Sequence, residues 1–131
     1  MGMGRVLVVD DEADLRKSAR LILTKAGYDV VEAEDGEKAI QAIRSGDNPL
    51  LLDTIICDLV MPKVNGVEAI AFFRQQFPRV PIIVLTGHPN VEGAADLFKK
   101  GVVDYLVKPI VPAKLLASVQ KAVKERELFE K

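Results

Sequence analysis

Five short apolar runs alternate with longer segments of helical periodicity along the length of this chain. The runs are rich in valine, isoleucine and leucine, and the segments between them repeat their apolar residues every three to four positions. Alternation of this kind favours parallel strands joined by right-handed helical crossovers, so we predict a single α/β domain. Its predicted strands are 5–9, 29–32, 54–57, 81–85 and 104–107, and its predicted helices are 12–26, 37–44, 66–77, 90–100 and 112–126.

Length and composition restrict the chain to a small set of protein classes. Its 131 residues suffice for one domain with a real core and are too few for two. A net charge of −1 gives no bulk attraction to nucleic acid or to an anionic membrane. No apolar run is long enough to cross a membrane, and the first residues lack the pattern of a signal peptide. We therefore expect a cytoplasmic protein that binds neither nucleic acid nor membrane directly.

Polar residues stand at the ends of four of the apolar runs. They are Asp10 and Asp11 after the first run, Asp58 after the third, Thr86 after the fourth and Lys108 after the fifth. Because the carboxyl ends of parallel strands meet at one edge of a sheet, we expect these side chains to share one crevice. Three crowded carboxylates destabilise a fold unless a cation or a phosphoryl group joins them. The pattern therefore indicates a site for such a ligand.

Each of these positions also has a simpler interpretation. Asp10 and Asp11 would suit the amino end of the first helix, where carboxylates meet free N–H groups and the positive end of the helix dipole. Both roles can coexist. Thr86 could simply end its strand, and a lysine at a strand end is usually just solvated. Asp58 could cap a turn or a helix, but the next predicted helix begins at Gly66.

Four motifs give the chain a resemblance to a known family. They are Val8-Val9-Asp10-Asp11-Glu12, Asp58-Leu59-Val60-Met61-Pro62 with Gly66, Leu85-Thr86-Gly87, and Tyr105-Leu106-Val107-Lys108-Pro109. In this order and on these elements, they resemble the receiver domain of two-component response regulators over residues 5 to about 126. The resemblance implies a flavodoxin-like, doubly wound five-stranded parallel sheet of order 2-1-3-4-5, flanked by five helices. Residues 1–131 would form one receiver domain, with 127–131 as a helical tail or the start of a connector.

The resemblance gives the phosphoryl-accepting role to Asp58, whose carboxylate can attack a phosphoryl group and hold it as an acyl phosphate. It assigns a Mg²⁺ ion to Asp11 and Asp58. The backbone carbonyl of Val60 completes the protein ligands, and Asp10 helps through water. Glu12 is expected to lie outside the direct ligands of the ion. Such an ion would relieve the repulsion between the carboxylates and an incoming phosphoryl group.

The same resemblance implies that Lys108 and Thr86 hold the transferred phosphoryl group. The Lys108–Pro109 peptide bond is expected to be cis. Thr86 would be drawn toward a phosphoryl oxygen, and Tyr105 would follow it from an exposed to a buried position. The simpler alternative is that Tyr105 is only a strand aromatic. The surface expected to change comprises the helix 90–100, the last strand and the last helix.

These assignments predict a signalling switch rather than an enzyme, with catalysis limited to its own phosphorylation and dephosphorylation. A sensor histidine kinase or a phosphotransfer protein would donate the phosphoryl group. A downstream effector domain or protein would respond to the new conformation. A homodimer could form through the helix 90–100, the last strand and the last helix. The chain could also be a receiver excised from a hybrid histidine kinase or from a transcription factor.

Two alternatives come from other classes of protein. A small phosphatase can also work through a phospho-aspartate, but such enzymes place a second aspartate two residues after the nucleophile, where this chain has Val60. A flavin or nucleotide domain of the same topology needs a glycine-rich phosphate loop after the first strand, where this chain has Asp10-Asp11-Glu12. Both alternatives therefore fit the sequence less well than a receiver.

A few positions depart from the family pattern or are ambiguous. Gly87 stands where alanine is usual and leaves more room at the site. His88 is interpreted as an exposed loop residue, but together with Val60 it could restrict the access of water to an acyl phosphate and lengthen its lifetime. Leucines 50–52 are expected in the core rather than in an exposed lip, and Cys57 is expected to be a small buried residue.

Overall fold

The computed structural model describes residues 3–61 and 65–130, with side chains as far as residue 126. Its centre is a five-stranded parallel sheet of order β2-β1-β3-β4-β5, as the resemblance implied. The strands are β1 (Arg5–Val9), β2 (Asp29–Ala33), β3 (Leu52–Cys57), β4 (Ile82–Thr86) and β5 (Asp104–Val107). The helices are α1 (Ala13–Lys25), α2 (Gly36–Ile43), α3 (Asn48–Leu51), α4 (Gly66–Gln76), α5 (Val91–Lys99) and α6 (Pro112–Glu130).

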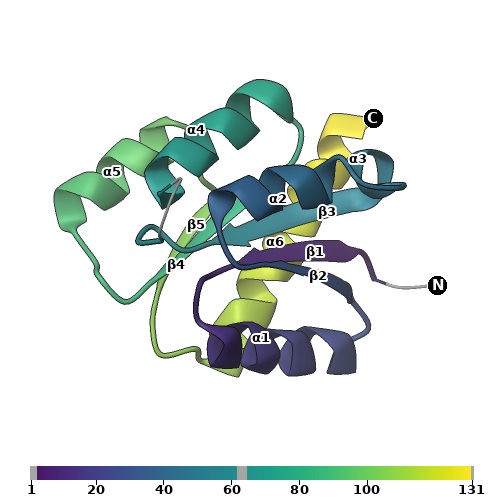
Figure 1. The fold of residues 1–131 in the computed structure, drawn as a ribbon, viewed down its shortest axis with the longest axis horizontal. Coiled ribbons are helices and arrows are strands. Elements are labelled where there is room, and N and C mark those ends of the chain that lie inside the picture. The colour runs from purple at the N-terminus through teal and green to yellow at the C-terminus, as the bar shows by residue number, and fades with distance from the viewer. Residues whose placement is uncertain (1–2, 62–64, 131) are drawn as a thin grey trace.

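Helices cover both faces of the sheet (Figure 1). α1 and α6 pack on one face, and α2, α4 and α5 pack on the other. Because successive residues of a strand point to opposite faces, β1 contributes to both cores. Val6 and Val8 face α1 and α6, whereas Leu7 and Val9 face the opposite layer. Burial on both faces explains why the strands appear in the sequence as unbroken apolar runs.

Local sequence signals set the helix ends close to their predicted positions. The side chains of Asp35, Asn65 and Asn90 cap α2, α4 and α5 by accepting hydrogen bonds from backbone N–H groups of the first helical turn. Gly27 follows α1 and Gly101 follows α5, with φ angles of 100° and 101°. These left-handed conformations favour glycine and turn the chain toward the next strand.

The segment before β3 differs from the prediction. Residues 48–51 form α3, a single helical turn with Pro49 near its start, so the described chain has six helices rather than five. Leu52 begins β3 and is buried, but Leu50 and Leu51 are 79% and 48% exposed. The expectation that residues 50–52 lie in the core was therefore wrong for two of the three, because the helical turn leaves both on the surface.

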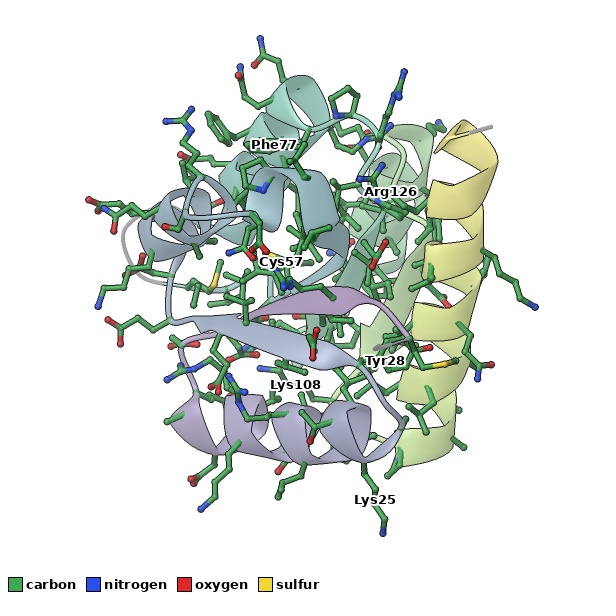
Figure 2. The ribbon with its side chains drawn as sticks, turned by 90° about the vertical axis from the view of Figure 1, so that its right-hand side faces the viewer. Lys25, Tyr28, Cys57, Phe77, Lys108 and Arg126 are labelled. Carbon is green, nitrogen blue, oxygen red and sulfur yellow. The ribbon has the colours of Figure 1, made fainter. Side chains whose placement is uncertain are left out.

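Cys57 lies inside β3, in the middle of the molecule (Figure 2). Burial raises the pKa of its thiol, and the thiol is free. It is the small buried residue that the sequence predicted. Within residues 3–61 and 65–130, no helix has both the length and the apolar character needed to cross a membrane.

Candidate functional site

The sheet brings the predicted site residues together at its carboxyl edge. They are Asp10 after β1, Asp58 after β3, Thr86 at the end of β4 and Lys108 after β5. The strand pairing continues past β5, since the Lys108 N–H donates to the Thr86 carbonyl at 2.8 Å. The order of strands reverses between β1 and β3, and open α/β sheets bind their ligands at such a point.

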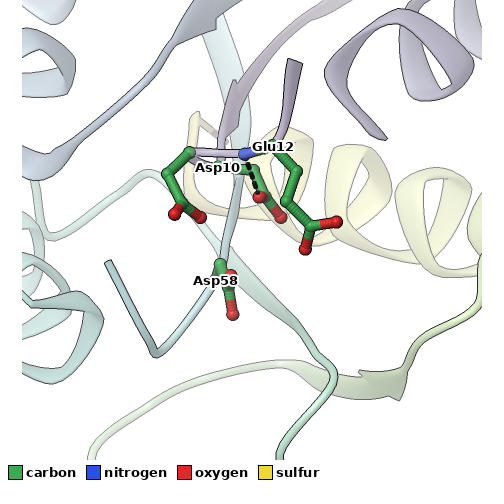
Figure 3. Close-up of side chains that lie close together, drawn as sticks. Asp10, Glu12 and Asp58 are labelled. Atoms are coloured by element: carbon green, nitrogen blue, oxygen red, sulfur yellow. Dashed lines mark hydrogen bonds between the residues drawn. The ribbon is translucent and has the colours of Figure 1, made fainter. Parts of the chain in front are cut away.

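Four acidic side chains crowd this edge. One oxygen from each of Asp10, Asp11, Glu12 and Asp58 lies within 4.8 Å of the other three. Figure 3 shows Asp10 and Glu12 on the segment after β1, with Asp58 across from them. Asp10 and Asp58 are buried, whereas Asp11 and Glu12 are exposed. Buried carboxylates in such a cluster are unfavourable unless positive charge compensates them.

The two side-chain oxygens of Asp10 have different contacts. Its Oδ1 accepts a hydrogen bond from the Glu12 backbone N–H at 2.9 Å. Its Oδ2 is buried and, in the part of the chain that the structure describes, has no hydrogen bond beyond its 2.9 Å ion pair with Lys108 Nζ. Burial raises the pKa of Asp10 above its ordinary value. These observations fit a carboxylate oriented toward a divalent cation such as Mg²⁺, which prefers oxygen ligands.

Lys108 supplies positive charge to the crevice. Its Nζ lies 2.7 Å from Glu12 Oε1, 2.9 Å from Asp10 Oδ2 and 3.1 Å from Asp58 Oδ2. Burial disfavours the charged form, but the contacts with the three carboxylates outweigh burial and raise the pKa of Lys108 above its usual value. Lys108 is therefore an ammonium at neutral pH. The Lys108–Pro109 peptide bond is cis, as predicted.

The contact between Glu12 and Lys108 was not predicted from the sequence. Glu12 was expected only to stand outside the direct metal ligands, whereas its carboxylate accepts a hydrogen bond from Lys108 Nζ, and this bond lowers the pKa of Glu12. The signal available in the sequence was the position of Glu12 beside Asp11. Periodicity does not show which of several neighbouring acids a lysine side chain will contact.

The loop after β3 is shaped around Asp58. The Val60 backbone N–H donates to Asp58 Oδ1 at 3.3 Å, and the Val60 side chain is exposed. A Cβ on Gly66 would lie 1.9 Å from the Asp58 carbonyl oxygen, so only glycine permits the start of α4 to approach this loop so closely. Pro62, the last residue of this motif, lies outside the described residues.

Thr86 and Tyr105 lie on neighbouring strands beside the crevice. Thr86 is fully buried, and its Oγ1 accepts a hydrogen bond from the His88 backbone N–H at 3.1 Å. Tyr105 is half-buried, and its hydroxyl accepts a hydrogen bond from the Asn90 backbone N–H at 3.4 Å. Both hydroxyls therefore hold the loop that joins β4 to α5.

A small pocket of about 160 Å³ opens among these groups. The residues that line it are Asp11, Glu12, Asp58, Val60, Gly87, His88 and Lys108. A Cβ on Gly87 would lie 3.6 Å from Lys108 Cδ, which is an ordinary contact. The pocket thus brings carboxylates, an ammonium and a loop imidazole together, an arrangement that suits a cation together with a phosphoryl group.

A family model described as the response regulator receiver domain matches residues 6–120. The chain belongs to this receiver family. The receiver is 34% identical over 121 residues to the chemotaxis protein CheY of Thermotoga maritima, and the aligned region covers 92% of this chain and 98% of CheY. It is 31% identical over 124 residues to the transcriptional regulatory protein FixJ of Bradyrhizobium diazoefficiens, which covers 95% of this chain. A solved receiver domain protein from Clostridium thermocellum superposes with a TM-score of 0.89 at 26% identity, covering 97% of this chain and 99% of that one.

These similarities identify what the fold is used for. The receiver is a phosphoacceptor domain of two-component signalling, and its family acts as signalling switches. The match extends over most of the sheet and includes all four predicted motifs, which favours this family over a phosphatase or a flavin domain. The receiver spans 98% of the length of CheY but only 58% of FixJ, so its relatives include proteins of its own length and longer ones.

Proposed function

We propose that this receiver takes a phosphoryl group from a phosphohistidine onto Asp58 and that the acyl phosphate changes the conformation of the domain. The observation that carries the proposal is the position of Asp58. It is 4% exposed, follows the central strand β3, lies close to the acids after β1 and contacts the ammonium of Lys108. A carboxylate held in such a place can act as a nucleophile toward phosphorus.

The transfer exchanges one bond to phosphorus for another. A carboxylate oxygen of Asp58 attacks, the P–N bond of the phosphohistidine breaks, and its electron pair returns to the imidazole nitrogen. Lys108 Nζ, 3.1 Å from Asp58 Oδ2, is placed to turn toward a phosphoryl oxygen. The Thr86 hydroxyl donates a hydrogen bond to another phosphoryl oxygen. Catalysis then consists of positioning and charge stabilisation by groups that lie close to Asp58.

A Mg²⁺ ion fits the acidic cluster, because its four carboxylates outnumber the ammonium of Lys108, which contacts three of them. Among the described residues, the buried Asp10 Oδ2 has no hydrogen bond beyond its ion pair with this ammonium. Asp11 and Asp58 would hold the ion directly with the Val60 carbonyl, and Asp10 would do so through water. When bound, the ion supplies positive charge between the carboxylates and the phosphoryl oxygens.

The conformational response is expected to pass through Thr86 and Tyr105. In this structure, the Thr86 hydroxyl accepts a hydrogen bond from the His88 N–H. When the hydroxyl turns to a phosphoryl oxygen, this hydrogen bond breaks, and the loop between β4 and α5 is then free to move. Tyr105 would turn inward as its bond to Asn90 is lost. The surface formed by α5, β5 and α6 would change, and an effector domain, an effector protein or a second copy of the chain would bind it.

A groove beside the pocket offers a place for the phosphohistidine donor. The groove lies between α1 and the loop after β5, and its apolar lining includes Leu15, Ile22 and Ile110. Glu12 and Lys108 form its border with the pocket. A histidine kinase or phosphotransfer protein with apolar residues around its phosphohistidine would bury this lining and bring phosphorus to Asp58.

Intact-mass spectrometry after incubation with acetyl phosphate tests this proposal. We expect a gain of one phosphoryl group that requires Mg²⁺ and is removed by hydroxylamine, which cleaves acyl phosphates. Asp58→Asn should remain unlabelled. A label that persists in Asp58→Asn would place the acceptor elsewhere. A folded wild-type protein that takes no label from acetyl phosphate or from histidine kinases would overturn the assignment of Asp58.

A further inference from the structure

The polar groups of Asp10 are almost all held by the protein. Its N–H donates to the Ala33 carbonyl at 3.1 Å, and its Oδ1 accepts from the Glu12 N–H at 2.9 Å. Its carbonyl oxygen accepts a hydrogen bond from Arg16 Nη1 at 2.6 Å. Its Oδ2 has no hydrogen bond among the described residues beyond the 2.9 Å ion pair with Lys108 Nζ. The direction of Oδ2 therefore depends on four contacts, and one of them comes from a charged side chain on α1.

Arg16 is itself fixed by a second contact. Its Nε lies 3.2 Å from Glu32 Oε1, and the Arg16 side chain is only 16% exposed. The other oxygen of Glu32 accepts a hydrogen bond from Arg20 Nε at 2.5 Å. Glu32 lies on β2 opposite Val8 of β1, so this chain of contacts ties α1 to the sheet just behind the acidic cluster.

The geometry of a guanidinium suits this role. Its donors form a rigid planar fork, so one group can donate to a carboxylate through Nε and to a carbonyl through Nη1 at the same time. Groups behind a metal ligand commonly fix its orientation and thereby set the affinity for the ion. Arg16 occupies such a place behind Asp10.

We propose that Arg16 is a positioning residue for the Mg²⁺ site, an inference that rests on the proposed function. Held by Glu32, Arg16 fixes the main chain of Asp10 so that Oδ2 faces the acidic cluster. This role opposes the direct effect of its charge, because a guanidinium near a cation site repels the cation. The two effects on Mg²⁺ affinity have opposite signs, so an experiment can separate them.

Calorimetric titration with Mg²⁺ of the unphosphorylated protein tests the proposal. We expect Arg16→Ala to weaken Mg²⁺ binding about tenfold, within the usual range for a residue behind a metal ligand. Arg20→Ala is the matched control, because it removes the same charge from the same helix and also loses a contact with Glu32, but does not touch Asp10. We expect its affinity to change by less than about twofold. Urea unfolding in EDTA confirms that each variant is folded.

Two results of this titration would overturn the inference. They are unchanged or tighter Mg²⁺ binding by a folded Arg16→Ala variant, and an equal loss of affinity in Arg20→Ala. A wild-type protein that binds no Mg²⁺ would overturn the cation site of the proposed function as well, which distinguishes the two failures.

Glu32 provides a second test that keeps Arg16 in place. Glu32→Gln loosens the guanidinium of Arg16, and we expect it to bind Mg²⁺ more weakly than the wild type. This variant also tests the inference if Arg16→Ala does not fold. In the double variant, Glu32→Gln should add nothing to the effect of Arg16→Ala, since residues that act in series are not additive. Additive losses would show that Glu32 acts on the ion independently of Arg16 and would overturn the proposed chain of contacts.

Discussion

The two edges of the sheet hold their charged groups in different ways. At the amino edge, the Arg5 N–H donates to Asp53 at 2.8 Å, and its guanidinium donates to Asp47 at 2.6 Å and to Asn48 at 2.9 Å. Each of these groups has a protein partner. At the carboxyl edge, the ammonium of Lys108 contacts three carboxylates, and a fourth carboxylate lies close by.

This difference separates charges that hold the fold from charges kept for a ligand. The amino-edge contacts join β1 to β3 and to the segment that leads into α3, and they are complete within the protein. The carboxyl-edge acids include two buried members and an oxygen that accepts no hydrogen bond in the described chain. Such a cluster is tolerated when a further cation completes it. The imbalance of charge, rather than the presence of acids, therefore marks the ligand site.

Asp53 and Asp58 lie near the two ends of the same strand and provide the largest expected contrast. Asp58→Asn should abolish labelling by acetyl phosphate, because an amide oxygen is a poor nucleophile. Asp53→Asn should label like the wild type and lose about 1 kcal/mol of unfolding free energy, because the Arg5 N–H keeps an acceptor. Intact mass and urea unfolding measure both effects. Loss of labelling in a folded Asp53→Asn variant would contradict the assignment of phosphorylation to the carboxyl edge alone.

Lys108 and Arg5 are the cations of the two edges, and their removal should differ in effect on stability. In EDTA, we expect Lys108→Ala to lower the unfolding free energy by about 3 kcal/mol, because it leaves buried carboxylates without their counter-charge. Arg5→Ala should lower it by about 1 kcal/mol, since its partner Asp47 is exposed.

Added Mg²⁺ should affect the stability of Lys108→Ala and Arg5→Ala differently. It should restore more stability to Lys108→Ala than to Arg5→Ala, since the ion replaces charge only at the carboxyl edge. Urea unfolding with and without Mg²⁺ measures the difference. Equal recovery in the two variants would contradict a cation site confined to that edge.

Val60 and His88 both line the pocket, and Val60 is 54% exposed. An apolar side chain here is expected to keep water away from the acyl phosphate. Val60→Asn should shorten the phosphorylated lifetime by up to about tenfold, because an amide can orient a water molecule for attack. Decay of the phosphorylated mass after removal of acetyl phosphate measures this lifetime. An unchanged lifetime would show that Val60 does not control water at the site.

The sequence predicted best what depends on topology and period. Parallel strands must bring Asp10, Asp58 and Lys108 to one edge, and neither side-chain torsions nor exact boundaries alter that. The contact of Lys108 with Glu12 and that of Arg16 with Asp10 depend on which of several reachable partners a long side chain meets. Hydrophobic periodicity carries no information on that choice.

The helix α3 escaped prediction for a related reason. A single turn is too short to show a helical period, and Pro49 between two polar residues and three leucines fits a loop or a strand start equally well. The buried Leu52 matches the expected core, whereas Leu50 and Leu51 are turned outward by a feature that periodicity cannot detect.

The cluster of Glu32 with Arg16 and Arg20 differs from both edges of the sheet, because its two cations outnumber its one acid. We expect its removal to have the smallest effect of the changes considered. Burial works against the ionisation of Glu32, but the two arginines outweigh it and lower the pKa of Glu32 below its ordinary value. The folded protein therefore holds this proton more weakly than the unfolded chain does. Stability from the cluster is present above about pH 4.5 and is lost as the pH falls through the lowered pKa.

Glu32→Gln should accordingly lower the unfolding free energy at pH 7 by about 1 kcal/mol, and this difference should shrink toward zero in acid. Urea unfolding in EDTA from pH 7 to about pH 3 follows it. Glu34→Gln is the control, because Glu34 pairs with Lys38 on the surface, where solvent screens the pair, and we expect no measurable change. If the difference in unfolding free energy between Glu32→Gln and the wild type persists in acid, Glu32 stabilises the fold by packing. The charge of Glu32 would then contribute less to stability than the charges at either edge of the sheet.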